Sequence, residues 1–132
     1  MPSWQGRFPA SPETVGIIRS EIAALARDCG LQDAAISDVK LAVTEAATNA
    51  IQHAYGDGPA GDVAATACTA TGVLRIVISD DGHGVFPRVN SPGLGLGLPL
   101  IAAVAKSFKM VSKPEGGTEM QITFPCPAAQ GS

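Results

Sequence analysis

Two polar residues one helical turn apart, Glu45 and Asn49, are the first candidates for chemistry in this sequence. Residues four apart on a helix lie one above the other, so these two side chains can reach one small volume. A carboxylate there could act as a base, and a carboxamide oxygen could bind a hard cation such as Mg²⁺. A solvated polar face without chemistry is the alternative that this helix alone leaves open.

A second candidate is Asp80, which follows an apolar stretch and precedes Gly82 and Gly84. An unpaired carboxylate at the end of a buried strand is costly. A carboxylate is sensible there if it accepts a hydrogen bond from a specific group, such as the exocyclic amine of adenine. The glycines let the backbone turn sharply and leave room for a flat ligand. A plain turn at the end of a strand is the alternative.

A glycine run with Gly93, Gly95 and Gly97 opens a segment of helical character. Free N–H groups and the positive end of a helix dipole would face the preceding loop, which makes an anion site suited to phosphates. No Gly-Lys-Ser/Thr follows, so this is not a P-loop, and the spacing does not fit the dinucleotide fingerprint. A flexible lid or close helix packing would use glycine equally well.

These candidates must be positioned by the surrounding helices and strands. Ser11, Pro12 and Glu13 read as a helix start, with Gly30 placed to end that helix. Asp33 can cap the helix of Glu45 and Asn49, with both on the side away from an apolar stripe. That stripe consists of Ile36, Val39, Val43, Ala47, Ala50 and Ala54. The other predicted elements are an extended piece over 5–9, strands over 62–70 and 73–80, a helix from 98 to about 108, and strands over 110–113 and 118–124.

Helices gather early and strands mostly late, which predicts a two-layer α+β sandwich rather than a parallel βαβ fold. We expect a mixed, mostly antiparallel sheet covered on one face by three helices. The 132 residues indicate a single domain over 1–132, with a frayed tail over 125–132.

Composition excludes several classes of function. The net charge is −3 without any run of Lys or Arg, so nucleic acid is not expected as a partner. No apolar run is long enough to span a bilayer, and the N-terminus lacks the layout of a signal peptide. The three cysteines are widely separated and lack metal-ligand spacing. We therefore expect a cytoplasmic protein whose cysteines are small hydrophobic residues or bystanders.

The set of motifs and its order carry more information than any single motif. Glu45-x-x-x-Asn49 comes first, then Asp80-x-Gly-x-Gly, then the glycine run, then Gly-Gly-Thr118 before the last strand. With these motifs the sequence resembles the ATPase superfamily of DNA gyrase, heat-shock chaperones, sensor histidine kinases and mismatch-repair ATPases. Within it, residues 45–55 look most like the anti-sigma-factor serine kinases of bacteria. The resemblance covers residues 6 to 124.

The resemblance implies a Bergerat-type ATP-binding fold and a role for each matching residue. Glu45 would be the general base, and Asn49 would bind Mg²⁺. Asp80 would hold the adenine amine, and Thr118 would support it from the last strand. The glycines would shape the adenine pocket (Gly82 and Gly84) and form a lid whose N–H groups meet the phosphates (Gly95 and Gly97). The cofactors would be ATP or ADP with Mg²⁺.

Several functions remain open from the sequence. The first is a protein-serine kinase that phosphorylates an anti-sigma antagonist; the family resemblance further implies that it binds and blocks a sigma factor as a homodimer. The second is a catalytically inactive, nucleotide-dependent binding module, which the short segment between Gly84 and Gly93 keeps open. The catalytic half of a histidine kinase is a third, although neither His53 nor His83 sits where a phosphoacceptor is expected. A structural domain with glycine-rich turns is the least specific reading.

Overall fold

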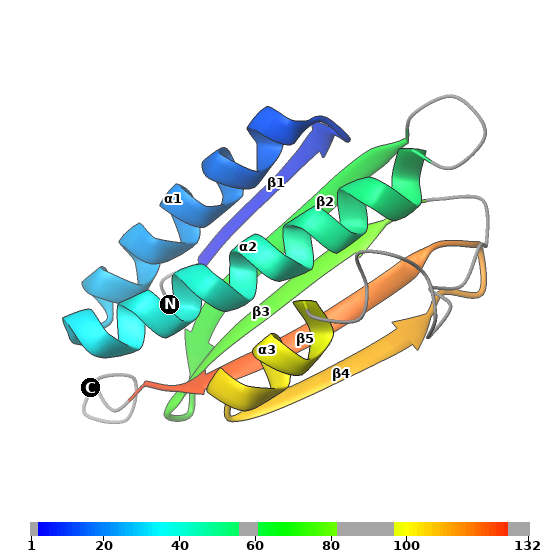
Figure 1. The fold of residues 1–132 in the computed structure, drawn as a ribbon. Helices are drawn as coiled ribbons and strands as arrows, with labels where there is room; N and C mark the ends of the chain where they lie inside the picture. The colour runs from blue at the N-terminus through cyan, green and yellow to red at the C-terminus, as the bar shows by residue number, and fades with distance from the viewer. Residues whose placement is uncertain (1–2, 56–60, 82–96, 127–132) are drawn as a thin grey trace.

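The computed structural model describes residues 3–55, 61–81 and 97–126, in which five strands form one sheet and three helices lie on one of its faces (Figure 1). The elements in chain order are β1 (Ser3–Pro9), α1 (Pro12–Asp28), α2 (Asp33–Tyr55), β2 (Asp62–Ala70), β3 (Val73–Asp80), α3 (Gly97–Val104), β4 (Ser107–Ser112) and β5 (Thr118–Pro125). The predicted two-layer α+β sandwich is confirmed. None of the described helices has the length and apolar character required to cross a bilayer.

The sheet has the strand order β1-β2-β3-β5-β4, and each of these four described pairs is antiparallel. The sheet is therefore more regular than the mixed sheet that we expected. Ser79 of β3 pairs with Glu119 of β5. Continuing this register by one residue sets Asp80 beside Thr118, so the pairing of β3 with β5 brings two predicted site residues together.

The core lies between the sheet and the helices, as the alternation of β3 predicts. Leu74, Ile76 and Ile78 are fully buried, whereas Arg75 is exposed on the other face. Strand β2 presents small residues to the helices, with Ala65 and Ala67 almost fully buried. Because these side chains are small, the helices can approach the sheet closely, and the interface between helices and sheet stays close-packed.

Helix α1 begins at Pro12, as predicted, after Ser11 in an extended conformation. The hydroxyl of Ser11 makes no cap hydrogen bond, so the expected serine cap is wrong in this detail. The hydroxyl of Thr14 donates to the carbonyl of Pro9 at 2.8 Å and ties the first turn to β1 instead. The helix ends before Gly30, whose φ of 91° is the left-handed conformation that glycine favours at this position.

Helix α3 ends at Val104, earlier than the predicted end near residue 108. The N–H of Lys106 donates to the carbonyl of Thr123 at 2.8 Å, and β4 starts at the next residue. Phe108, expected on the helix, lies in β4 and still packs against the core. Pairing with β5 thus supplies this segment with backbone hydrogen bonds in place of those that a longer helix would have made internally.

Gly16→Ala in α1 is expected to stabilise the protein by about 0.5–1 kcal/mol, because glycine in a helix interior is that much less favourable than alanine. The added Cβ would meet its nearest neighbour, the Arg19 guanidinium, at an ordinary 3.7 Å. Gly6→Ala is expected to lower the stability instead, because its added Cβ would lie 2.7 Å from the Phe8 ring. Urea unfolding of both variants tests the pair; a loss of stability in Gly16→Ala would contradict the open space at this position.

Two cysteines that are far apart in the sequence meet in the core. The thiol of Cys126 donates to the carbonyl of Cys29 at 3.4 Å, and the thiol of Cys29 donates to the carbonyl of Ala26 at 3.3 Å. Burial, together with the neighbouring Cys126, raises the pKa of the Cys29 thiol from 9.0 to about 12. The expectation that the cysteines act as small hydrophobic residues fits this burial.

The raised pKa predicts that the stabilising contribution of Cys29 is lost between pH 9.0 and about 12. In this range the unfolded chain gives up the thiol proton and the folded protein keeps it, so rising pH favours unfolding. The measurement is the free energy of unfolding against pH, compared with Cys29→Ala to remove the contributions of other groups. Parallel pH curves for the two proteins would show that Cys29 ionises equally in both states.

Candidate functional site

Helix α2 carries the first part of the candidate site. Asn49 is only 2% exposed, and Glu45 is half-buried one turn before it. The side-chain amide of Asn49 donates to the carbonyl of Glu45 at 3.0 Å, which fixes the orientation of the carboxamide. Among the described residues, Asn49 Oδ1 has no hydrogen-bond partner. The helix therefore holds a buried carbonyl oxygen in place and leaves it available to a ligand.

The burial of Asn49 differs from the sequence prediction, which placed it away from the core. Helix α2 contacts α1 on one side and α3 on the other, and it also covers β2 and β3 (Figure 1). Its buried arc is therefore wider than one stripe and includes Ala42 and Ala46. Asn49 lies at the edge of this arc, whereas Asp38 and Gln52 on the same helix are exposed.

The chemistry of Asn49 Oδ1 fits a hard cation. A buried polar atom without a partner costs about 1–3 kcal/mol, which a ligand at this position would offset. Mg²⁺ takes oxygen ligands and is commonly bound through one or two side chains together with the phosphates of a substrate. The described residues contain no cluster of three or more His, Cys, Asp or Glu that could hold a metal alone. The arrangement therefore suits a cation that shares its ligands with a nucleotide.

The second part of the site lies where β3 ends and β5 begins. Asp80 is 1% exposed and lies on the helix-covered face, in phase with Ile76 and Ile78. Thr118, the first residue of β5, is also buried. The carboxyl end of α2, the end of β3 and the start of β5 all lie toward one end of the molecule (Figure 1). The fold thus brings the predicted residues of α2, β3 and β5 to the same region.

Sequence reasoning assigned no role to Gly117, which determines how closely β5 approaches Asp80. Its φ is 92°, and a Cβ added to it would lie 2.1 Å from the carbonyl oxygen of Asp80. Only glycine can make this approach without moving the backbone of Asp80. The signal that could have revealed this role is the Gly-Gly-Thr sequence itself, because two consecutive glycines before a strand indicate an unusual backbone path.

The remaining predicted site residues can be placed only in part. Gly97 is the first residue of α3, which packs against α2. Gly82, Gly84 and Gly95 lie outside the described residues, as does the predicted lid between Gly84 and Gly93. Their assignments remain predictions.

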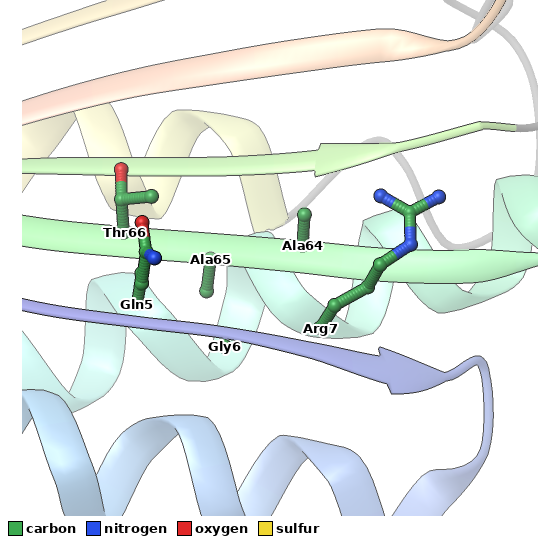
Figure 2. A pocket seen from close by; sticks show the side chains of 6 residues that line it. All are labelled: Gln5, Gly6, Arg7, Ala64, Ala65 and Thr66. Atoms are coloured by element: carbon green, nitrogen blue, oxygen red, sulfur yellow. The ribbon is translucent and has the colours of Figure 1, made fainter.

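A hollow of about 320 Å³ lies elsewhere, between β1 and β2 (Figure 2). It is lined by Gln5, Gly6, Arg7, Ala64, Ala65 and Thr66. The side chains of Gln5 and Arg7 alternate with Trp4 and Phe8, which pack against the core, so they lie on the sheet face that the described helices leave uncovered. None of the predicted site residues lines this hollow, which is therefore distinct from the candidate site.

The fold and this arrangement define a domain of the ATP-binding class. The family model of the histidine kinase-like ATPase domain matches residues 8–124, and the chain belongs to this family. The chain is similar to serine-protein kinase RsbW of Bacillus licheniformis, with 39% identity over 89 residues, which are 67% of this chain and 56% of that protein. The RsbW of Bacillus pumilus is 44% identical over 91 residues, with the same coverage. The chain thus spans about half the length of the curated relatives it matches.

Solved structures support the same fold. The structure of the RsbU and RsbW domains of Rv1364c from Mycobacterium tuberculosis matches with a TM-score of 0.70 and 20% identity, covering 95% of this chain and 32% of that chain. The catalytic domain of histidine kinase ThkA matches with a TM-score of 0.56 and 14% identity, covering 98% of this chain and 99% of that chain. At these identities the likeness concerns the fold alone.

Proposed function

We propose that this chain is an ATP-binding anti-sigma regulatory protein with protein-serine kinase activity. The observation that carries the proposal is the oriented, buried Asn49 one turn beyond Glu45, at the same end of the fold as the buried Asp80. The names of the similar proteins from Bacillus, which are serine-protein kinases, support the same activity. The proposed partners are an anti-sigma antagonist as the phosphorylated protein and a sigma factor as the sequestered one.

Each residue has a defined task in the proposed reaction. Asp80 would accept a hydrogen bond from the adenine amine, and Thr118 would support it. Asn49 Oδ1 would hold Mg²⁺ beside the phosphates, which supplies charge neutralisation when the ion is bound. Gly95 and Gly97 would present N–H groups to the phosphates, while Gly82 and Gly84 shape the adenine pocket.

Glu45 would accept the proton of the substrate serine hydroxyl as that oxygen forms its bond to the γ-phosphorus. The bond between the γ-phosphorus and the bridging oxygen breaks at the same time, and ADP leaves with that oxygen. The position of Glu45, half-buried and next to Asn49 on the same helix face, suits a base that works beside a nucleotide. We further propose that the protein acts in the cytoplasm as a homodimer, without contact to nucleic acid or membrane.

The experiment that tests this function is transfer of labelled γ-phosphate from Mg·ATP to small antagonist-type proteins of the same cell. The expected result is a phosphoserine in one of these proteins and ADP in equal amount. Binding of ATP without transfer to any of them would instead favour a nucleotide-gated binding module. Failure to bind ATP at all would reject both functions.

A further inference from the structure

Three charged residues join the ends of β1, β2 and β3 in a network that the proposed function does not use. The Arg7 guanidinium donates through Nε to Asp62 Oδ2 at 3.1 Å and through Nη2 to Asp81 Oδ2 at 3.2 Å. The N–H of Asp62 donates to the other carboxylate oxygen of Asp81 at 2.8 Å. We call Arg7, Asp62 and Asp81 the Arg7 clamp.

The clamp extends the sheet beyond its regular ladder. The last pair between β2 and β3 is Val63 with Asp80, so Asp62 and Asp81 are the next residues along. Their remaining backbone contact is long, with the N–H of Asp81 3.4 Å from the carbonyl oxygen of Asp62. The side chain of Arg7 extends from β1 across β2 (Figure 2). Its guanidinium donates to both carboxylates there. Side chains therefore make the connection where the backbone ladder weakens.

This connection acts on the backbone that carries Asp80. Asp81 follows Asp80 directly, and the Cβ position of Gly117 lies 3.1 Å from Asp81 Cα. The Asp80–Asp81 segment is thus held from β5 by the packing of Gly117 and from β2 and β1 by the clamp. Without the clamp, the Asp80–Asp81 segment loses the side-chain contacts that hold it from β2 and β1. The direction of the Asp80 carboxylate depends on that backbone.

We propose that Arg7 is a positioning residue of the nucleotide site, acting through Asp81 on Asp80; this inference rests on the proposed ATP-binding function. Without Arg7, the carboxylates of Asp62 and Asp81 repel each other at the end of the strand that presents Asp80. The three side chains are 42–60% exposed, so the effect is moderate and sensitive to salt.

The test compares ADP binding by wild type, Arg7→Ala and Arg75→Ala. Arg75 is a matched control: it is exposed on the same sheet face, carries the same charge, and lies about 17 Å from Asp80 along an extended strand. We expect Arg7→Ala to raise the Kd for ADP about three- to fivefold at low salt, with a ratio that approaches one at high salt. Arg75→Ala should leave the Kd nearly unchanged. Arg7→Lys should recover only part of the lost affinity. The ammonium restores the positive charge, but it cannot bridge both carboxylates as a guanidinium does.

Asp81→Asn separates positioning from direct attraction between Arg7 and the phosphates. If Arg7 positions Asp81, the variant weakens ADP binding, whereas direct attraction predicts tighter binding because a negative charge is lost. In the absence of nucleotide, we expect faster hydrogen exchange at the Asp62 amide in Arg7→Ala, because this amide donates to the Asp81 carboxylate that Arg7 holds. Three results would overturn the positioning role of Arg7: unchanged ADP binding in Arg7→Ala, an equal loss of affinity in Arg75→Ala, or tighter ADP binding in Asp81→Asn. Absence of ADP binding by wild type would reject the proposed function and this inference with it.

Discussion

Glu45→Gln is expected to lower the rate of phosphoryl transfer from Mg·ATP by about 10²–10⁴-fold, the usual contribution of a general base. Glutamine keeps the size of the side chain and the helix propensity, so folding should not change. ATP binding should also stay within about threefold of wild type, because the proposed role of Glu45 is proton removal. Single-turnover transfer of labelled phosphate to the antagonist, beside the Kd for ATP, measures both effects.

Asp38→Asn is the matched control for Glu45→Gln. Asp38 lies two turns earlier on the same side of α2, is exposed, and loses the same charge when it becomes an amide. Transfer by this variant should match wild type. If Glu45→Gln transfers phosphate as fast as Asp38→Asn does, Glu45 is not the base and the proposed mechanism fails even though the protein binds nucleotide.

Gly117→Ala is expected to raise the Kd for ADP at least about tenfold, because a change of about 1.4 kcal/mol at the proposed contact of Asp80 with adenine is enough for that loss. The new Cβ would lie 2.1 Å from the carbonyl oxygen of Asp80, so the backbone of Asp80 must move. The φ of 92° adds conformational strain of about 1–3 kcal/mol in a residue with a side chain. Isothermal calorimetry with ADP and urea unfolding measure the two effects separately.

Gly116→Ala controls for the strain alone. Gly116 has a φ of 105°, so alanine there meets a comparable backbone penalty in the same turn. The difference between the two variants therefore reports the contact with Asp80. If both lose the same stability and bind ADP equally well, the close approach of Gly117 does not position Asp80. If Gly117→Ala does not fold while Gly116→Ala does, the contact is required for the fold itself.

The sequence predicted those features that depend on local patterns. The alternation of Leu74, Ile76 and Ile78 identified β3 and its buried face, and the Ser11-Pro12 pair identified the start of α1. The end of α3 was missed, since the competing hydrogen bond comes from Thr123, far along the chain. Local patterns cannot contain that partner.

The candidate site was predicted as a set of residues and not as a geometry. The period of α2 places Glu45 and Asn49 on one side, but it does not reveal that α1 and α3 widen the buried arc until it includes Asn49. The contact of Gly117 with Asp80 and the bridging of two carboxylates by Arg7 join residues from different strands. Such contacts follow from strand order and register, which a single sequence does not specify.

The strand order also determines when this site can exist during synthesis. β5 is the last described strand along the chain, yet it lies inside the sheet, between β3 and β4. A growing chain that has not passed Pro125 lacks the strand that supports Asp80 and leaves β3 with an open edge. Pairings between distant segments form slowly, because the chain must close a long loop first. The proposed nucleotide site therefore cannot be complete before β5 has been made and has paired with β3.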